Sequence, residues 1–212
     1  MPKVYSLSFF LEPNTPNYGG VKDTVKIFPN RSIALGHTSN NHSFEFPGHI
    51  NTHIDFPRHF SLNGKTLNDY PPSFWVFDKV ELIQCDINDF HNEISKLDPR
   101  AEMVIYKSGF GKYRGEDRYW AEQPVIPASF ASSLKVQCPS IRVFGFDMIS
   151  LTSQLDKSEG KKAHIAFLIE SDILVMEDMN LSEINHKPSR VIIAPLLINN
   201  ADGVPCNIFA FE

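Results

Sequence analysis

The sequence predicts a single mixed α/β domain, of α/β or α+β type, around a central mixed β-sheet. Three observations predict it: short strand-like runs fill the first quarter, strands and helices alternate in the middle, and two strand-like runs close the chain. At 212 residues and 42% apolar composition, the chain is long enough for one well-packed domain and too short for two. We therefore expect residues 1–212 to form one domain.

In the first quarter, runs of β-branched and aromatic residues are separated by segments rich in proline, glycine and asparagine. The expected strands cover residues 3–11, 21–28, 32–35 and 43–46. Turns or loops are expected at 12–20, at Pro29-Asn30 and at 38–42. These expected strands are followed by a histidine-rich segment, residues 46–60.

From residue 79 onward the pattern alternates more regularly. Apolar residues at helical spacing predict a helix over 87–97, and two further helices are expected over 127–136 and 158–169. Pro127 stands in the first turn of the second helix, where its missing donor costs nothing, and Ser158 is the expected cap of the third. The expected strands cover 79–85, 103–106, 141–146, 173–176, 190–198 and 206–211, and the last two are joined by a turn at 199–203.

The overall charge and hydropathy exclude several classes of function. A net charge of −5 and a pI near 5.9, with scattered basic residues, give no reason to expect nucleic-acid binding. No apolar run approaches the ~20 residues that span a bilayer, and the N-terminus lacks the features of a secretory signal. We expect a soluble, cytoplasmic protein with no membrane partner.

The three cysteines, Cys85, Cys138 and Cys206, are odd in number and far apart. Cys85 and Cys206 stand in apolar, strand-like sequence. These features favour reduced core thiols over a disulfide framework, and nothing nearby suggests an activated cysteine nucleophile.

The most informative segment contains His49, His53, Asp55 and His59, in the pattern His-x3-His-x-Asp-x3-His. In a straight strand, residues four apart would be about 13 Å apart and could not share an ion. In one turn of helix they approach to ~5–6 Å, which would pair His49 with His53 and Asp55 with His59. With Gly48 and Pro57 opposing a long helix, we expect a ligand-bearing loop that leaves a strand and forms a tight turn or a short irregular helical piece.

Imidazoles and a carboxylate together suit a borderline or hard divalent ion such as zinc or manganese. The alternative is that these histidines only cap turns or satisfy buried polar groups. Four ligand-type residues at turn spacing favour the metal site, because such a constellation is more specific than a two-residue motif.

The same residues resemble the signature His-x-Gly-Thr-His-x-Asp-x-Pro-x-His of the metal-dependent cyclase and kynurenine formamidase family. Every position matches except that Asn51 stands where the family has glycine. Asparagine is the non-glycine residue that best tolerates a positive φ, so the departure is conformationally mild. The resemblance implies a swivelling β/β/α fold around a barrel-like sheet.

The resemblance also implies two divalent metal ions, with Asp55 bridging both. A histidine on a later helix and a glutamate at a strand end would complete the site, and His164 and Glu177 match them in order and local context. Their alternative roles are a surface histidine and a solvated acidic residue, and Glu170 and Asp172 are nearby competitors. In the family the position of His59 is the catalytic histidine, although His59 could equally be a metal ligand.

Three aromatic residues are candidates for the substrate pocket. Tyr18 matches the aromatic residue that the family carries on its first loop, and a loop-covering role is the alternative. Phe74 and Trp75, in the rigid loop that begins at Pro71, could wall an aromatic pocket, although core packing is the more common use.

Two divalent ions ~3.5–4 Å apart can hold a water, lower its pKa toward ~7 and polarise a carbonyl. The predicted activity is therefore metal-dependent hydrolysis of an amide, with His59 shuttling the proton to the leaving nitrogen. The leading substrate is an aryl formamide such as N-formylkynurenine. The alternatives are a cyclic-amide (isatin-like) hydrolase or cyclase, and a non-catalytic metal-binding relative. We expect a homodimer or higher homo-oligomer.

Overall fold

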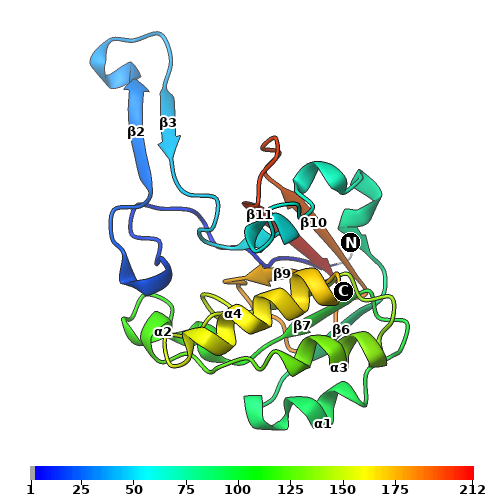
Figure 1. Ribbon diagram of the computed structural model, residues 1–212. Coiled ribbons are helices and arrows are strands. Elements are labelled where there is room, and N and C mark those ends of the chain that lie inside the picture. The colour runs from blue at the N-terminus through cyan, green and yellow to red at the C-terminus, as the bar shows by residue number, and fades with distance from the viewer. Residues whose placement is uncertain (1–2) are drawn as a thin grey trace.

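The computed structural model describes residues 3–212, and its centre is a strongly curved, nine-stranded sheet (Figure 1). Eight strands follow the order β5-β10-β11-β4-β9-β8-β7-β6, and β1 pairs with β11 beside this path. The strands are β1 (Val4–Ser6), β4 (His53–Asp55), β5 (Val76–Phe77), β6 (Val80–Ile83), β7 (Met103–Tyr106), β8 (Val143–Phe146), β9 (Leu174–Glu177), β10 (Arg190–Pro195) and β11 (Gly203–Phe211).

The sheet is mixed and nearly closed into a barrel. Strands β6 to β9 run parallel, whereas the remaining pairs, from β9–β4 to β10–β5, are antiparallel. Strands β5 and β6 stand at opposite ends of the strand order, yet only Asp78 and Lys79 separate them in the chain. The sheet must therefore curl back on itself, which confirms the predicted mixed, barrel-like α/β domain.

Helices cover the parallel part of the sheet. They are α1 (Phe90–Ile94), α2 (Arg118–Ala121), α3 (Ser129–Gln137) and α4 (Lys157–Ile165), the last followed by a π-helical turn, Ala166–Glu170. Figure 1 shows α1, α3 and α4 on one side of the sheet, with α1 packed on α3 and α3 on α4. Parallel strands need such crossover connections, which place helices over their faces.

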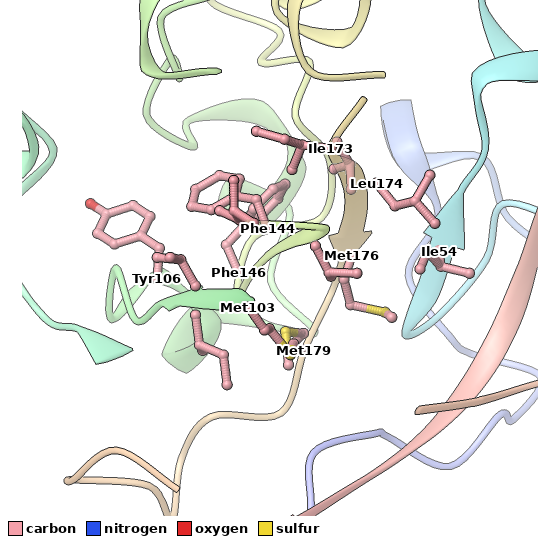
Figure 2. Close-up of a cluster of buried hydrophobic side chains, with 14 of the residues drawn as sticks. Ile54, Met103, Tyr106, Phe144, Phe146, Ile173, Leu174, Met176 and Met179 are labelled. Atoms are coloured by element: carbon pink, nitrogen blue, oxygen red, sulfur yellow. The ribbon is translucent and has the colours of Figure 1, made fainter. Parts of the chain in front are cut away.

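The hydrophobic core lies between these helices and the sheet. Every residue of β7, β8 and β9 is buried, as expected for parallel strands that are covered on both faces. Figure 2 shows Phe144, Met176 and Ile54, from three neighbouring strands, in this core. The cysteines are free thiols, two of them buried and Cys85 half-buried.

A long hairpin departs from the prediction. Strand β2 (Lys26–Arg31) runs through Pro29 and Asn30, where a turn was expected, and pairs with β3 (Asn41–Glu45). Proline is tolerated because both strands of a two-stranded ribbon are edge strands. The pairing register also shifts between Pro29 and Arg31. The predicted strand 32–35 is instead a short 3-10 turn, Ile33–Leu35, at the tip of the hairpin.

The start of the third predicted helix is also corrected. The cap of α4 is Asp156, whose carboxylate accepts the backbone N–H of Glu159 over 2.9 Å, whereas Ser158 lies inside the first turn. Both residues are good caps, so the sequence alone did not separate them. Within residues 3–212, no helix combines the length and the apolar character that crossing a membrane would require.

Candidate metal centre

The histidine-rich segment contains the turn and the short helical piece that the spacing predicted, but its middle is a strand, which was not predicted. A bend at residues 48–52 leads into β4 (His53–Asp55), and a 3-10 turn (Pro57–His59) follows. Strand β4 is extended because it pairs with β11 on one side and β9 on the other. Since side chains two residues apart on a strand lie on the same face, those of His53 and Asp55 point to the same side of β4.

The bend before β4 brings His49 back over the strand. Its ring centroid lies 5.4 Å from that of His53, far closer than an extended chain would allow. Asn51 takes up the left-handed conformation with a φ of 59°, as its residue type permits. Gly203 of β11 leaves room for the imidazole, since a Cβ there would stand 2.2 Å from the His49 ring.

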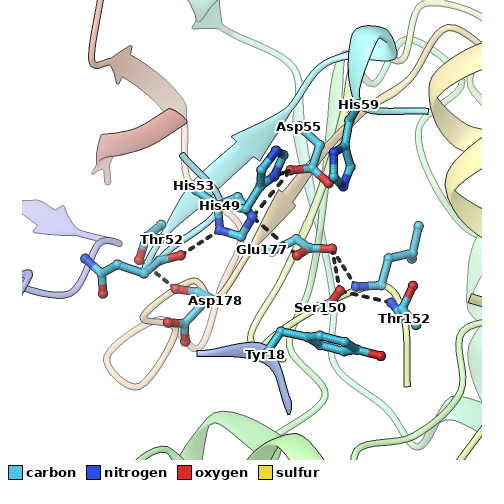
Figure 3. A network of polar contacts seen from close by, with 12 residues as sticks. Tyr18, His49, Thr52, His53, Asp55, His59, Ser150, Thr152, Glu177 and Asp178 are labelled. Atoms are coloured by element: carbon cyan, nitrogen blue, oxygen red, sulfur yellow. Dashed lines mark hydrogen bonds and ion pairs between the residues drawn. The ribbon is translucent and has the colours of Figure 1, made fainter. Parts of the chain in front are cut away.

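Four buried side chains converge beneath this bend: His53 and Asp55 of β4, Glu177 at the end of β9, and His164 of α4. The first three are drawn in Figure 3. His53 Nε2 lies 3.3 Å from an Asp55 oxygen and 3.4 Å from a Glu177 oxygen. His164 Nε2 lies 3.5 Å from Asp55 and 3.4 Å from Glu177. All four residues are at most 4% exposed.

These separations fit a metal ion better than a set of hydrogen bonds. Ligands ~2.1 Å from a tetrahedral ion are roughly 3.4 Å apart, whereas hydrogen bonds are shorter. His53 Nε2 has this spacing from one oxygen of Asp55 and one of Glu177, and His164 Nε2 has it from the other oxygen of each carboxylate. His53 Nε2 is buried and has no hydrogen-bond partner, a cost that coordination would remove. The residues present therefore fit a divalent metal.

A second group lies nearer the surface. His49 Nδ1 is 2.8 Å from an Asp55 oxygen, and the rings of His49 and His59 stack with centroids 3.9 Å apart. Donor atoms of His49, Asp55 and His59 lie within 4.8 Å of one another, as do those of His53, Asp55 and Glu177. Asp55 belongs to both groups, so within residues 3–212 its carboxylate is the part that these two groups share.

The inner side chains are held by further contacts. His53 Nδ1 donates to the carbonyl of Asn51 over 2.8 Å, and His164 Nδ1 donates to that of Gly160 over 2.9 Å. Because carbonyls only accept, both imidazoles turn Nε2 toward the carboxylates, which is the arrangement typical of metal-binding histidines.

Burial and close neighbours shift the pKa values of the histidines and of Asp55 in the centre. Burial lowers the pKa of His53, but the Asp55 carboxylate 3.3 Å away and the charge of Glu177 outweigh it and raise this pKa to about 9. Burial also lowers the pKa of His164, but the Asp55 and Glu177 carboxylates outweigh it and raise this pKa to about 10. Burial raises the pKa of Asp55, but the three imidazoles around it, those of His164, His49 and His53, hold it well below its usual range. By contrast, burial lowers the pKa of His59, which favours its neutral form.

A cation must displace these protons, so its binding should depend on pH. The raised histidine pKa values stabilise the ion-free fold fully below about pH 6.5, and this contribution is lost as the pH rises through about 9 to 10. We expect the rise in thermal midpoint on adding Mn²⁺ to chelator-treated protein to grow by several degrees between pH 6 and 8.5. Differential scanning fluorimetry measures it. A shift that stays constant or shrinks over this range would contradict the proton displacement.

The centre opens into a cavity of about 360 Å³, a volume typical of small-molecule pockets. Tyr18 lines it, together with His49, His59 and the inner side chains. Phe74 and Trp75 do not line it: they pack against Tyr70 and Phe77, with ring centroids 4.7–6.3 Å apart. Phe74 and Trp75 therefore pack in the hydrophobic core, which was the alternative to a role in the substrate pocket.

The two competing carboxylates are not part of the centre. Glu170 is exposed at the end of the π-helical turn, and Asp172 pairs with Lys65 over 3.0 Å at the surface. Sequence reasoning missed Asp202, whose carboxylate lies 3.2 Å from His49 Nε2 and 3.5 Å from His59 Nδ1. The sequence showed it only as a turn residue, since the pairing of β11 with β4 brings it there.

Comparison with known proteins defines the class to which this fold and centre belong. Residues 5–153 match the family model described as "Putative cyclase", which covers more than half of the chain. The protein therefore belongs to the cyclase family. Its structural neighbours include a potential metal-dependent hydrolase with cyclase activity, with a TM-score of 0.76, 21% identity, and coverage of 100% of this chain and 98% of the neighbour.

Individual relatives are more distant. A kynurenine formamidase of Bacillus cereus is 27% identical over 165 residues, which cover 74% of this chain and 73% of the relative. An uncharacterised protein of Methanocaldococcus jannaschii is 28% identical over 164 residues, covering 76% of this chain and 77% of the relative. The structure of isatin hydrolase A from Labrenzia aggregata has a TM-score of 0.83 at 18% identity, covering 99% of this chain and 93% of the neighbour, which shows a shared fold.

Proposed function

We propose that the protein is a metal-dependent hydrolase of the formamidase type, which cleaves the amide of a small aryl formamide such as N-formylkynurenine. The observation that carries the proposal is the buried set of imidazole and carboxylate donors ~3.4 Å apart on the wall of a cavity. The similarity to the Bacillus cereus kynurenine formamidase supports the formamide as substrate.

His53, His164, Asp55 and Glu177 would hold one ion, zinc or manganese, and His49 with the shared Asp55 would hold a second. Such ions lower the pKa of bound water and polarise a carbonyl. His59, kept neutral by burial, would accept a proton at one ring nitrogen and return it to the leaving nitrogen. Asp202, near Nδ1 of His59, would orient that ring. Tyr18 would cover the substrate from the side of the first loop.

A second candidate keeps the centre and changes the substrate to a cyclic amide. The similarity in fold to isatin hydrolase over nearly the whole chain favours it, since a ring amide needs the same activated water. The third candidate is that the protein is a metal-binding member of the family without catalytic activity.

An assay of purified, metal-analysed protein on matched substrates tests the proposal. Formanilide and N-formylkynurenine represent open formamides, and isatin represents a ring amide. We expect stoichiometric metal, and formate released from the open substrates with a higher kcat/KM than ring opening of isatin. Ring opening alone would favour the second candidate, and bound metal without turnover of any amide would favour the third.

We also propose that the protein forms a homodimer, with the β2–β3 hairpin in the contact. The hairpin projects from the body of the molecule (Figure 1), and an isolated two-stranded ribbon is marginally stable in water. It carries four apolar side chains that are 45–78% exposed: Phe28, Ile33, Leu35 and Phe44. A second copy of the chain is the simplest cover, because two-fold dimers are the commonest assemblies.

Light scattering should therefore give about twice the chain mass of 24.1 kDa. Phe44→Ser should shift the protein toward the monomer because it removes apolar contact area. Val136→Ser, at an 82% exposed apolar site on α3, serves as the control and should leave the mass unchanged. A wild-type monomer at high concentration would contradict the proposal.

A further inference from the structure

Arg114 lies between β7 and α2, just after a 3-10 turn (Phe110–Tyr113), and its side chain reaches the residues behind the candidate metal centre. Its Nε and Nη2 atoms each donate to the Asp178 carboxylate over 2.9 Å, one to each oxygen. The guanidinium also stacks on the Phe9 ring, 3.9 Å from its centroid. Because the pair is two-pronged and its side chains are only 12% and 1% exposed, it fixes Asp178 in one geometry.

Asp178 directly follows Glu177, the last residue of β9, and has a left-handed φ of 51°. Its N–H donates to the Met148 carbonyl over 2.8 Å, and its carbonyl accepts the Thr52 hydroxyl over 2.6 Å. Its carboxylate also accepts the Tyr119 hydroxyl over 2.6 Å. A shift of Asp178 would therefore move the backbone that carries Glu177.

The same guanidinium reaches the other side of the centre. Its Nη2 donates to the amide oxygen of Asn51 over 2.8 Å, and the Asn51 amide nitrogen donates to the carbonyl of Phe9 over 2.8 Å. The Asn51 backbone carbonyl accepts the proton of His53 Nδ1. The amide side chain thus anchors a bend in a left-handed conformation, and the carbonyl of that bend sets the orientation of His53. A glycine at position 51 could adopt the bend but could not make either side-chain bond.

We propose that Arg114 is a positioning residue that, by binding Asp178 and Asn51 at once, fixes Glu177 relative to His53 and so sets the affinity of the centre for a divalent ion. This inference rests on the proposed function, because it requires an ion between those two side chains. Arg114 acts only through its neighbours. The loss of a contact that supports a metal-binding side chain typically costs about 10- to 100-fold in affinity.

Calorimetric titration of chelator-treated protein with Mn²⁺, well below the thermal midpoint, tests the proposal. Arg114→Lys keeps the positive charge but loses the two-pronged geometry, and we expect Mn²⁺ affinity to fall by about 10- to 100-fold. Asn51→Gly keeps the left-handed bend and removes both side-chain bonds, with an expected fall of about 10-fold. Arg118→Lys is the matched control, because Arg118 also stacks on an aromatic ring, that of Tyr113 at 3.8 Å, and has no bond to the centre.

The outcomes separate this inference from the proposal on which it rests. Weaker binding in Arg114→Lys and Asn51→Gly, with Arg118→Lys within about twofold of wild type, supports it. Wild-type affinity in a folded Arg114→Lys or Asn51→Gly protein overturns it while leaving the metal centre intact. A wild-type protein that takes up no ion overturns the metal centre itself, and the inference with it. If Arg114→Lys fails to fold, Asn51→Gly alone decides, because glycine adopts a φ of 59° without strain.

Discussion

Replacing Asp55 with asparagine is expected to abolish both metal binding and hydrolysis. Asp55 is 1% exposed and is the only residue shared by the two candidate metal groups. The neutral amide removes the charge that holds the surrounding histidines and offers only one oxygen donor. We expect Mn²⁺ affinity to fall by more than ~100-fold, and activity by more than ~10³-fold, as when one member of a group that acts as a unit is lost. Metal analysis and formate release measure the two effects.

A second buried aspartate provides the control for Asp55→Asn. Asp147 is 4% exposed, and its carboxylate accepts hydrogen bonds from Ser108, Gly109 and Gly111, outside the candidate centre. Asp147→Asn should lower the thermal midpoint while leaving the metal content of the folded protein unchanged. Full metal occupancy in Asp55→Asn would refute the assignment of Asp55 as the shared carboxylate.

Replacing His59 with glutamine is expected to lower kcat by about 10²- to 10⁴-fold, the range for removal of a general acid or base, while the metal content stays at the wild-type level. Glutamine keeps polarity and similar bulk but cannot carry a proton near neutral pH. The loss should be smaller for formanilides with electron-withdrawing ring substituents, because their leaving nitrogen needs less protonation. Steady-state kinetics over such a series, with metal analysis of each preparation, gives the result.

The alternative role of His59 gives a different outcome. His59 donor atoms lie within 4.8 Å of those of His49 and Asp55, so the residue is also placed to bind an ion. If His59→Gln loses metal together with activity, and the loss is equal for all leaving groups, His59 is a ligand and the proton transfer needs another group. His91→Gln, at an exposed position of α1, is the matched control and should match wild type in both measurements.

Patterns local in sequence predicted much of the fold. The predicted strands 103–106 and 141–146 correspond to the buried strands Met103–Tyr106 and Val143–Phe146, and the helices expected over 127–136 and 158–169 correspond to α3 and α4. The predictions failed where two local preferences competed: Asp156 and Ser158 are both good caps, and Pro29 suits either a turn or an edge strand. The π-helical turn after α4 gave no signal in the sequence.

In the histidine-rich segment too, the local sequence predicted some features correctly and missed others. Its residue types indicated a metal site, but its backbone was predicted as turn or helix and includes a strand. That strand exists because β9 and β11 pair with it, and β9 begins more than a hundred residues later. Pairing over such a distance leaves no periodic trace in the sequence, so no local pattern could have placed Asp202 or Arg114 beside the site.

By itself, the sequence determined the chemistry available to this protein: imidazoles and carboxylates in one short segment, a later histidine on a helix, and a glutamate at a strand end. Residue types and local spacing carry that information because ligand preference and helix periodicity depend on near neighbours. The tertiary structure decided which groups meet. It brought His164 and Glu177 to Asp55, took Phe74 and Trp75 into the core, and set Arg114 behind the centre. Those contacts follow from strand order and packing, which only the folded chain defines.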